Sequence, residues 1–79
     1  MKKNLIPLNM LPPGSSGKVR VINAEGGARR RMLDLGLIDG TKVEALRKSP
    51  LGDPVAFQIR GAVIALRTEE SSKILVEIC

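Results

Sequence analysis

Histidine, tyrosine and tryptophan are absent from this sequence, which also has only one phenylalanine and one cysteine. Without histidine, the usual acid–base group at neutral pH is missing, and so are Ser-His and Cys-His nucleophile pairs. The 79 residues correspond to one small domain, residues 1–79, with little room for a deep substrate pocket. These absences predict a protein that is not an enzyme and has no catalytic residues.

The shortage of metal ligands and cysteines argues against two further kinds of site. A single cysteine, Cys79, cannot form an internal disulfide, which is typical of a reducing, cytoplasmic compartment. Sites for Fe(II) or Zn(II) are built from histidine, cysteine and carboxylates. The adjacent carboxylates of Glu69 and Glu70 are better explained as charges at the start of a helix. We therefore expect no metal site and no bound cofactor.

Long apolar runs are missing as well. No apolar run approaches the roughly 18 residues that a transmembrane helix requires. The basic N-terminal stretch is interrupted by Pro7, Asn9, Pro12 and Pro13. We therefore expect neither a membrane span nor a signal peptide.

Basic residues are in excess, with 13 lysines and arginines against eight acidic residues and a net charge of +5. This balance favours acidic partners, nucleic acid or an anionic membrane surface. The densest cluster is Arg29, Arg30 and Arg31, which we expect at the start of a helix, where cations oppose the helix dipole. We predict a binding patch for an acidic protein surface, lipid headgroups or a nucleotide phosphate. The alternative is that these arginines are simply solvated, with Arg31 paired to Asp34.

The hydrophobic pattern is mostly one of alternation in short runs, which indicates a mainly β fold. It predicts one helix over residues 28–35 and a helical turn over residues 69–71 that Thr68 caps. Residues 1–10 are expected to form an extended arm or edge strand. We expect a small, SH3-like, partly open β-barrel of five to six strands with one short inserted helix and a C-terminal helical turn. The expected strands cover residues 18–23, 42–48, 55–60, 62–67 and 74–78. The strand over residues 62–67 is apolar on both faces.

Glycines mark the expected turns, and two leucines stand beside them. Leu37 and Leu51 each adjoin a glycine, so we predict exposed anchors for a partner, together with Asp53 of the same loop as Leu51. The alternative is that Leu37 packs on the end of the helix and Leu51 packs on the core. The only aromatic residue, Phe57, is expected to point inward, which leaves no aromatic groove for proline-rich peptides. The glycines predicted in structural turns are Gly36, Gly40, Gly52 and Gly61.

Four blocks of the sequence resemble the FeoA family, the small cytosolic accessory proteins of bacterial ferrous iron transport. The resemblance extends from about Leu8 to Ile78. It implies an SH3-like β-barrel and a partner, the membrane ferrous iron permease with its cytosolic GTP-binding domain. It also implies a cytoplasmic protein that reaches the inner face of the membrane through this partner. The blocks are RMLDLGLIDGTKV at residues 31–43, SPLGDP at 49–54, Gly61 with IALR at 64–67, and Glu69-Glu70.

Two other functions remain open on the sequence alone. An RNA-binding SH3-like barrel is compatible with the net charge and with the basic strand that carries Lys18 and Arg20, but the chain lacks aromatic residues that stack on bases. A barrel like that of iron-dependent repressors would need a DNA-binding region for which 79 residues leave no room. We therefore expect no nucleic-acid partner, and weak self-association stays open.

Overall fold

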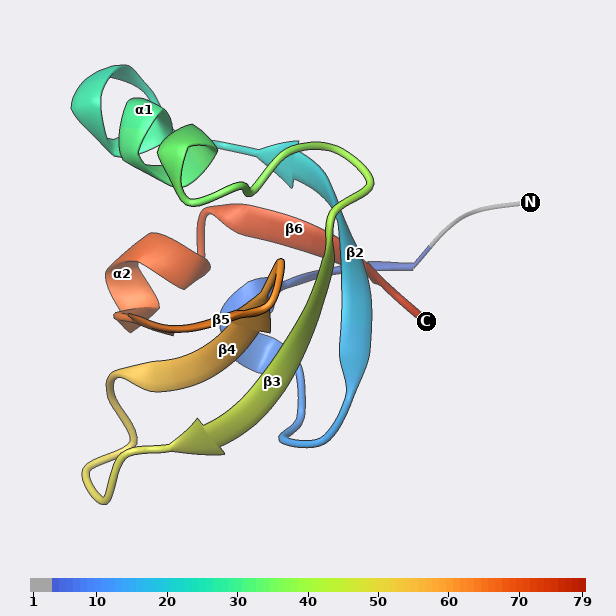
Figure 1. Cartoon of the computed structure of the whole chain (residues 1–79), viewed down its shortest axis with the longest axis vertical. Helices are drawn as coiled ribbons and strands as arrows, with labels where there is room; N and C mark the ends of the chain where they lie inside the picture. Colours follow the sequence, from blue (N-terminus) through green and yellow to red (C-terminus); the bar gives the residue numbers. More distant parts are fainter. Residues whose placement is uncertain (1–3) are drawn as a thin grey trace.

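Six β-strands and three short helical segments make up the computed structural model, which describes residues 4–79 (Figure 1). The strands form one antiparallel sheet in the order β1-β6-β2-β3-β4-β5. The strands are β1 (Leu5–Pro7), β2 (Ser16–Ile22), β3 (Lys42–Lys48), β4 (Val55–Ile59), β5 (Ala62–Leu66) and β6 (Ile74–Ile78). The helical segments are the 3-10 helix η1 (Leu8–Met10) and the α-helices α1 (Gly26–Asp34) and α2 (Thr68–Ser71).

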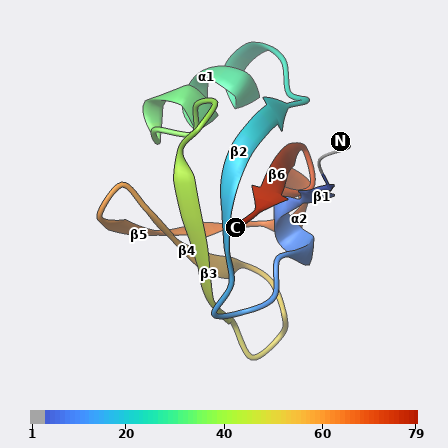
Figure 2. The same cartoon turned by 90° about the vertical axis from the view of Figure 1, so that its right-hand side faces the viewer.

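The expected mainly β architecture is confirmed, and the sheet is open rather than closed. β5 runs across β2 and β3 instead of alongside them in Figure 2. Two register shifts contribute to this twist, one between Val19 and Val21 of β2 and one between Ala45 and Arg47 of β3. The β4–β5 pair has a continuous register without such a shift. The far end of the sheet is therefore a regular two-stranded hairpin.

The predicted arm over residues 1–10 is only partly a strand. Residues 1–3 lie outside the described residues, and the strand ends at Pro7. Proline has no N–H for a ladder, so the chain turns at once into η1, which buries Leu8. The N-terminal segment is thus a short edge strand followed by a buried helical turn.

Phe57 lies at the centre of the core and is fully buried, as its alternation with exposed neighbours predicts. The strand over residues 62–67, expected to be apolar on both faces, is an edge strand in which only Leu66 is buried. Its other apolar side chains are exposed or half-buried because no strand or helix covers them. The buried apolar residues are Leu8, Leu11, Val19, Ala24, Met32, Leu37, Val43, Ala45, Val55, Phe57, Ile59, Leu66, Ile74 and Val76.

The end of α1 follows the predicted glycine stop. Gly36 has a φ of +92°, and its N–H donates to the carbonyl of Leu33 at 3.0 Å. The N–H of Leu37 donates to the carbonyl of Met32 at 3.0 Å. These two bonds are those of a Schellman motif, which needs a left-handed residue after the helix. The other glycines predicted in turns, Gly40, Gly52 and Gly61, also have positive φ.

The start of α2 differs from its expected form. Arg67, not Thr68, is the residue at the cap position, and its N–H donates to Glu70 Oε1 at 3.2 Å. Thr68 is the first helical residue, and its N–H donates to Asp53 Oδ1 at 2.8 Å. The cap of α2 therefore comes from a loop that is distant in sequence, a contact that local sequence patterns do not indicate.

Candidate partner-binding surface

The three arginines predicted to form a binding patch lie on α1, at one end of the long axis of the molecule (Figure 1). The helix begins at Gly26, two residues before the expected start, so the arginines occupy its middle and last turn. The prediction that they oppose the helix dipole is therefore wrong, because cations near the C-terminus of a helix are favourable. An unfavourable interaction with the helix dipole therefore gives no argument that these arginines have a function.

Contacts within the chain separate these arginines from one another. Arg31 Nη1 pairs with Glu70 Oε2 of α2 instead of with Asp34. Arg29 Nη1 donates to the carbonyl oxygen of Ile22 at 3.2 Å. Arg30 is exposed, and its side chain makes no hydrogen bond or ion pair with any other residue in the range 4–79. Arg30 is thus the arginine of this cluster whose charge has no partner within residues 4–79.

Leu37 is not a partner anchor. Its side chain is 0% exposed and belongs to the core, so its prediction as an exposed anchor is wrong. The Schellman motif explains this burial, because it packs the residue after the glycine against the last turn of the helix. Ile38, the next residue, is 46% exposed beside α1.

Leu51 and Asp53 lie in the loop between β3 and β4, at the other end of the molecule from α1 in Figure 1. Leu51 is 94% exposed, which agrees with the anchor interpretation and excludes packing on the core. Asp53 Oδ1 accepts hydrogen bonds from the N–H and the hydroxyl of Thr68, at 2.8 and 3.2 Å. Asp53 therefore holds the loop against α2, and the structure does not join this loop and the arginines into one patch.

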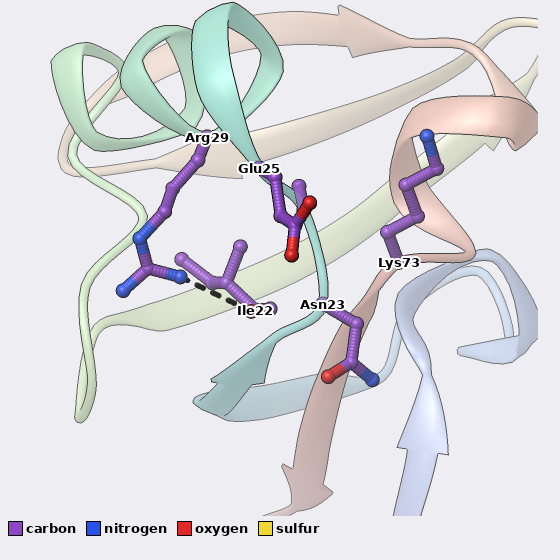
Figure 3. A pocket seen from close by; sticks show the side chains of 6 residues that line it. Ile22, Asn23, Glu25, Arg29 and Lys73 are labelled. Carbon is purple, nitrogen blue, oxygen red and sulfur yellow. Dashed lines mark hydrogen bonds between the residues drawn. The ribbon is translucent and has the colours of Figure 1, made fainter.

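A groove that the sequence did not predict lies beside α1 (Figure 3). The side chains of Glu25, Arg29 and Lys73 border it, and the Asn23 N–H donates to the Lys73 carbonyl at 2.7 Å. Lys73 reaches this groove from about 50 residues away in sequence, so no local motif could indicate it. The groove is thus bordered by two cations and one carboxylate.

The outer face of the sheet carries further charges. Lys18 of β2 is directly opposite Lys42 of β3 and Glu77 of β6. Arg20 Nε lies 2.9 Å from Glu77 Oε1, and Arg20 Nη1 lies 3.2 Å from Asp39 Oδ1. The hydrogen bond to Glu77 and then that to Asp39 raise the pKa of Arg20 above its ordinary value. The predicted basic face of β2 is therefore partly neutralised by acidic neighbours.

A second groove lies at the loop end of the molecule, on the outer face of β4 and β5. It holds about 290 Å³. Its floor is apolar and its rim is basic, a combination that fits a protein segment better than a small ion. We call it the hairpin groove, and its lining residues are Arg47, Lys48, Ser49, Pro50, Pro54, Ala56 and Ala65.

Neither a metal site nor a membrane span is expected from the sequence. Among residues 4–79, no three side chains of histidine, cysteine, aspartate or glutamate come together in a group that could hold a metal ion. Cys79 is exposed. None of the helices in this range is long and apolar enough to span a membrane, and the longest, α1, has nine residues.

Comparison with known proteins gives the family. The FeoA domain model matches residues 6–78. The chain belongs to the FeoA family. This family is associated with ferrous iron transport, as the sequence resemblance implied.

Solved structures of FeoA proteins share the fold. The NMR structure of a FeoA-like protein from Clostridium acetobutylicum is 40% identical with a TM-score of 0.88, covering 99% of this chain and 90% of that one. The crystal structure of Stenotrophomonas maltophilia FeoA complexed with zinc is 30% identical with a TM-score of 0.77, covering 89% and 87%. That protein is called a prokaryotic SH3 domain protein, which confirms the SH3-like class of the present fold.

A curated relative places a similar sequence in a larger protein. It is the Fe(2+) transport protein A/Fe(2+) transporter FeoB fusion protein of Porphyromonas gingivalis, 31% identical over 71 residues. The match covers 90% of this chain but only 8% of the fusion protein. A manganese-dependent transcriptional repressor also matches, at 18% identity and a TM-score of 0.86 over 44% of its chain, and shares the fold alone.

Proposed function

We propose that this chain is a non-catalytic accessory protein of bacterial ferrous iron uptake that binds the cytosolic side of the ferrous iron permease and its GTP-binding domain. The supporting observation is the Porphyromonas gingivalis protein, in which a FeoA sequence and the transporter FeoB share one polypeptide. Fusion keeps two proteins at high effective concentration, which is useful when they act together. The protein is cytoplasmic and reaches the inner face of the membrane through this partner.

The end of the molecule that carries α1 is the first candidate for the permease contact. The side chain of Arg30 is exposed without a partner in residues 4–79, and Arg29 borders the polar groove. Exposed arginines favour an acidic surface, because they can form bidentate bonds with carboxylates. The exposed apolar side chains of Leu33 and Ile38 adjoin them and supply area for close packing. Binding at this end would regulate the permease by favouring one of its nucleotide states.

A copurification experiment tests this proposal. The chain is mixed with the cytosolic GTP-binding domain of the permease from the same organism, with and without guanine nucleotide. We expect a complex whose affinity changes with the nucleotide. Absence of a complex in every nucleotide state, together with unchanged iron uptake after deletion of this chain, would contradict the proposal. A salt-sensitive complex with RNA instead would favour the RNA-binding alternative.

Matched charge variants locate the surface. We expect the double variant Arg29→Gln/Arg30→Gln to bind the GTP-binding domain about tenfold more weakly, since each lost charge pair weakens a polar interface modestly. The control is Lys18→Gln/Lys42→Gln, which removes the same charge from two exposed lysines on the outer face of β2 and β3. Equal losses for both variants would show a general electrostatic attraction and not a docking site on α1.

A further inference from the structure

β5 is one of the two edge strands of the sheet, and β4 is its only neighbouring strand among residues 4–79. Arg60 and Gly61 form a two-residue turn with φ of 50° and 82°, so Ile59 and Ala62 are the hydrogen-bonded pair that flanks it. In an antiparallel pair, hydrogen-bonded and non-hydrogen-bonded positions alternate. Val63 and Ala65 therefore direct their N–H and carbonyl groups away from β4, toward the side where the sheet has no neighbouring strand.

This edge lacks the features that normally prevent strand addition. Natural proteins protect edges with charged residues, proline, bulges or very short strands. β5 is five residues long, contains neither a charged residue nor proline, and has a continuous register with β4. Val63 is 66% exposed, and Ala65 is exposed as well. An unprotected apolar edge of this length is a template for pairing.

The surroundings of the edge indicate the chemistry of the added strand. The side chain of Ala65 is part of the floor of the hairpin groove, whose rim carries Arg47 and Lys48. Arg60 precedes β5 and Arg67 follows it, and both are exposed. A strand laid along β5 would thus place alternate side chains over an apolar floor and would end near cations on both sides. Acidic residues at its ends are the complementary charges.

We propose that β5 binds an extended segment of another protein, with alternating apolar residues and acidic residues at its ends, as an added antiparallel strand. The proposal goes beyond the function above, because it does not depend on which protein supplies the segment. A second copy of this chain fits less well. Antiparallel pairing of β5 with itself around Ile64 would bring Gly61 opposite Arg67 and so place Arg60 close to the partner's Arg67. That arrangement opposes like charges.

A peptide titration followed by NMR tests the proposal on the full chain. The probe is a blocked seven-residue peptide in which valine and threonine alternate between terminal glutamates. At about 1 mM peptide, we expect the amides of Val63 and Ala65 to shift and their hydrogen exchange to slow by about tenfold or more. Ala62 and Ile64, whose N–H groups already face β4, should show little change in exchange. No shift up to the solubility limit of the peptide, or shifts centred on α1, would overturn the proposal.

Two controls separate strand addition from other modes of binding. The same peptide with lysines in place of the glutamates should bind about tenfold more weakly at low salt. The variant Val63→Pro removes an N–H that faces the free edge and leaves the β4 ladder intact, so it should fold and bind at least about fivefold more weakly. The matched variant Val63→Thr keeps this N–H and should bind like the original chain.

If Val63→Pro fails to fold, Ala65→Pro provides the same test at the other outward N–H group. Equal binding by the proline and threonine variants would show that the main chain of β5 does not take part, which overturns the proposal. The amide exchange of Val63 and Ala65 could also become slower as the protein concentration rises in the absence of peptide. This result would overturn the proposal in favour of pairing between two copies of this chain.

Discussion

The two edges of the sheet differ in the features that control strand pairing. β1 has three residues, ends at a proline and continues directly into η1, whose Leu8 is fully buried. β5 has five apolar residues, a regular register and no proline, and most of its side chains are exposed. Both edges enclose the same core, so the difference does not follow from a need for stability. It shows that protection against pairing is decided locally, by a few residues at each edge.

The largest effect is expected from the core beneath the open edge. Phe57 pairs across β4 and β5 with Ile64 and is the only aromatic side chain in the core. We expect Phe57→Ala to lower the free energy of unfolding by about 3–5 kcal/mol, because it removes a large apolar side chain and leaves a cavity. Urea unfolding followed by circular dichroism measures this loss.

A more conservative change keeps this prediction measurable if Phe57→Ala does not fold. Phe57→Leu retains most of the apolar volume and should cost about 1 kcal/mol. As a comparison at the edge formed by β1, Leu8→Ala should lower the free energy of unfolding by about 2–5 kcal/mol. If the Phe57 variants were no less stable than the original chain, β5 would not be held on the core through this side chain.

The turn that leads into β5 gives the next largest effect. Gly36 has a positive φ, and a Cβ added there would collide with the side chain of Arg60 in this turn. We expect Gly36→Ala to cost about 2 kcal/mol, since it adds this collision to the cost of a left-handed alanine. Gly61→Ala, at a φ of 82° with nothing within 4 Å, should cost about 1 kcal/mol.

Thermal unfolding of the two glycine variants and of the double variant Gly36→Ala/Arg60→Ala distinguishes the causes. The Arg60 substitution should restore part of the stability lost at Gly36, because it shortens the colliding side chain. If it restores nothing, the cost at Gly36 comes from the backbone alone.

Loss of the cap that follows β5 should have a smaller effect. Asp53→Ala removes the acceptor for the N–H and hydroxyl of Thr68, and we expect it to lower the free energy of unfolding by about 1 kcal/mol. Asp53→Asn keeps an acceptor oxygen and should lose less than half of this amount. Equal losses would show that the negative charge near the start of α2 matters more than the hydrogen bond.

Local patterns were sufficient for most of the strands. β3 and β6 have the predicted bounds, and Gly36 ends α1 as expected. In each case the signal lies in adjacent residues, either as alternation or as a glycine that must take positive φ. The helix start was two residues late because no side chain caps it, so the sequence before Gly26 carries no capping signal.

The candidate surface was predicted less well, because its contacts join distant parts of the chain. The Arg31–Glu70 and Asp53–Thr68 pairs span 39 and 15 residues and engage two predicted partner residues within the fold. For Leu37 the sequence left two interpretations open, an exposed anchor beside a glycine and packing on the end of the helix, and its burial confirms the second. Nor could the sequence identify β5 as an edge, since edge and central strands of apolar residues share the same pattern.

The smallest effect on stability, and the sharpest contrast between the edges, is expected from a single lysine. Val63→Lys places a charge on the exposed face of β5 and should change the free energy of unfolding by less than about 0.5 kcal/mol. It should nevertheless slow aggregation of the concentrated protein, because lysine protects an edge against pairing. Gln58→Lys is the matched control, since Gln58 is exposed directly opposite Val63 on β4, a strand with neighbours on both sides. Light scattering at equal concentrations compares the two variants. If both slow aggregation equally, the added charge acts on the whole molecule and the edge of β5 has no special part in association.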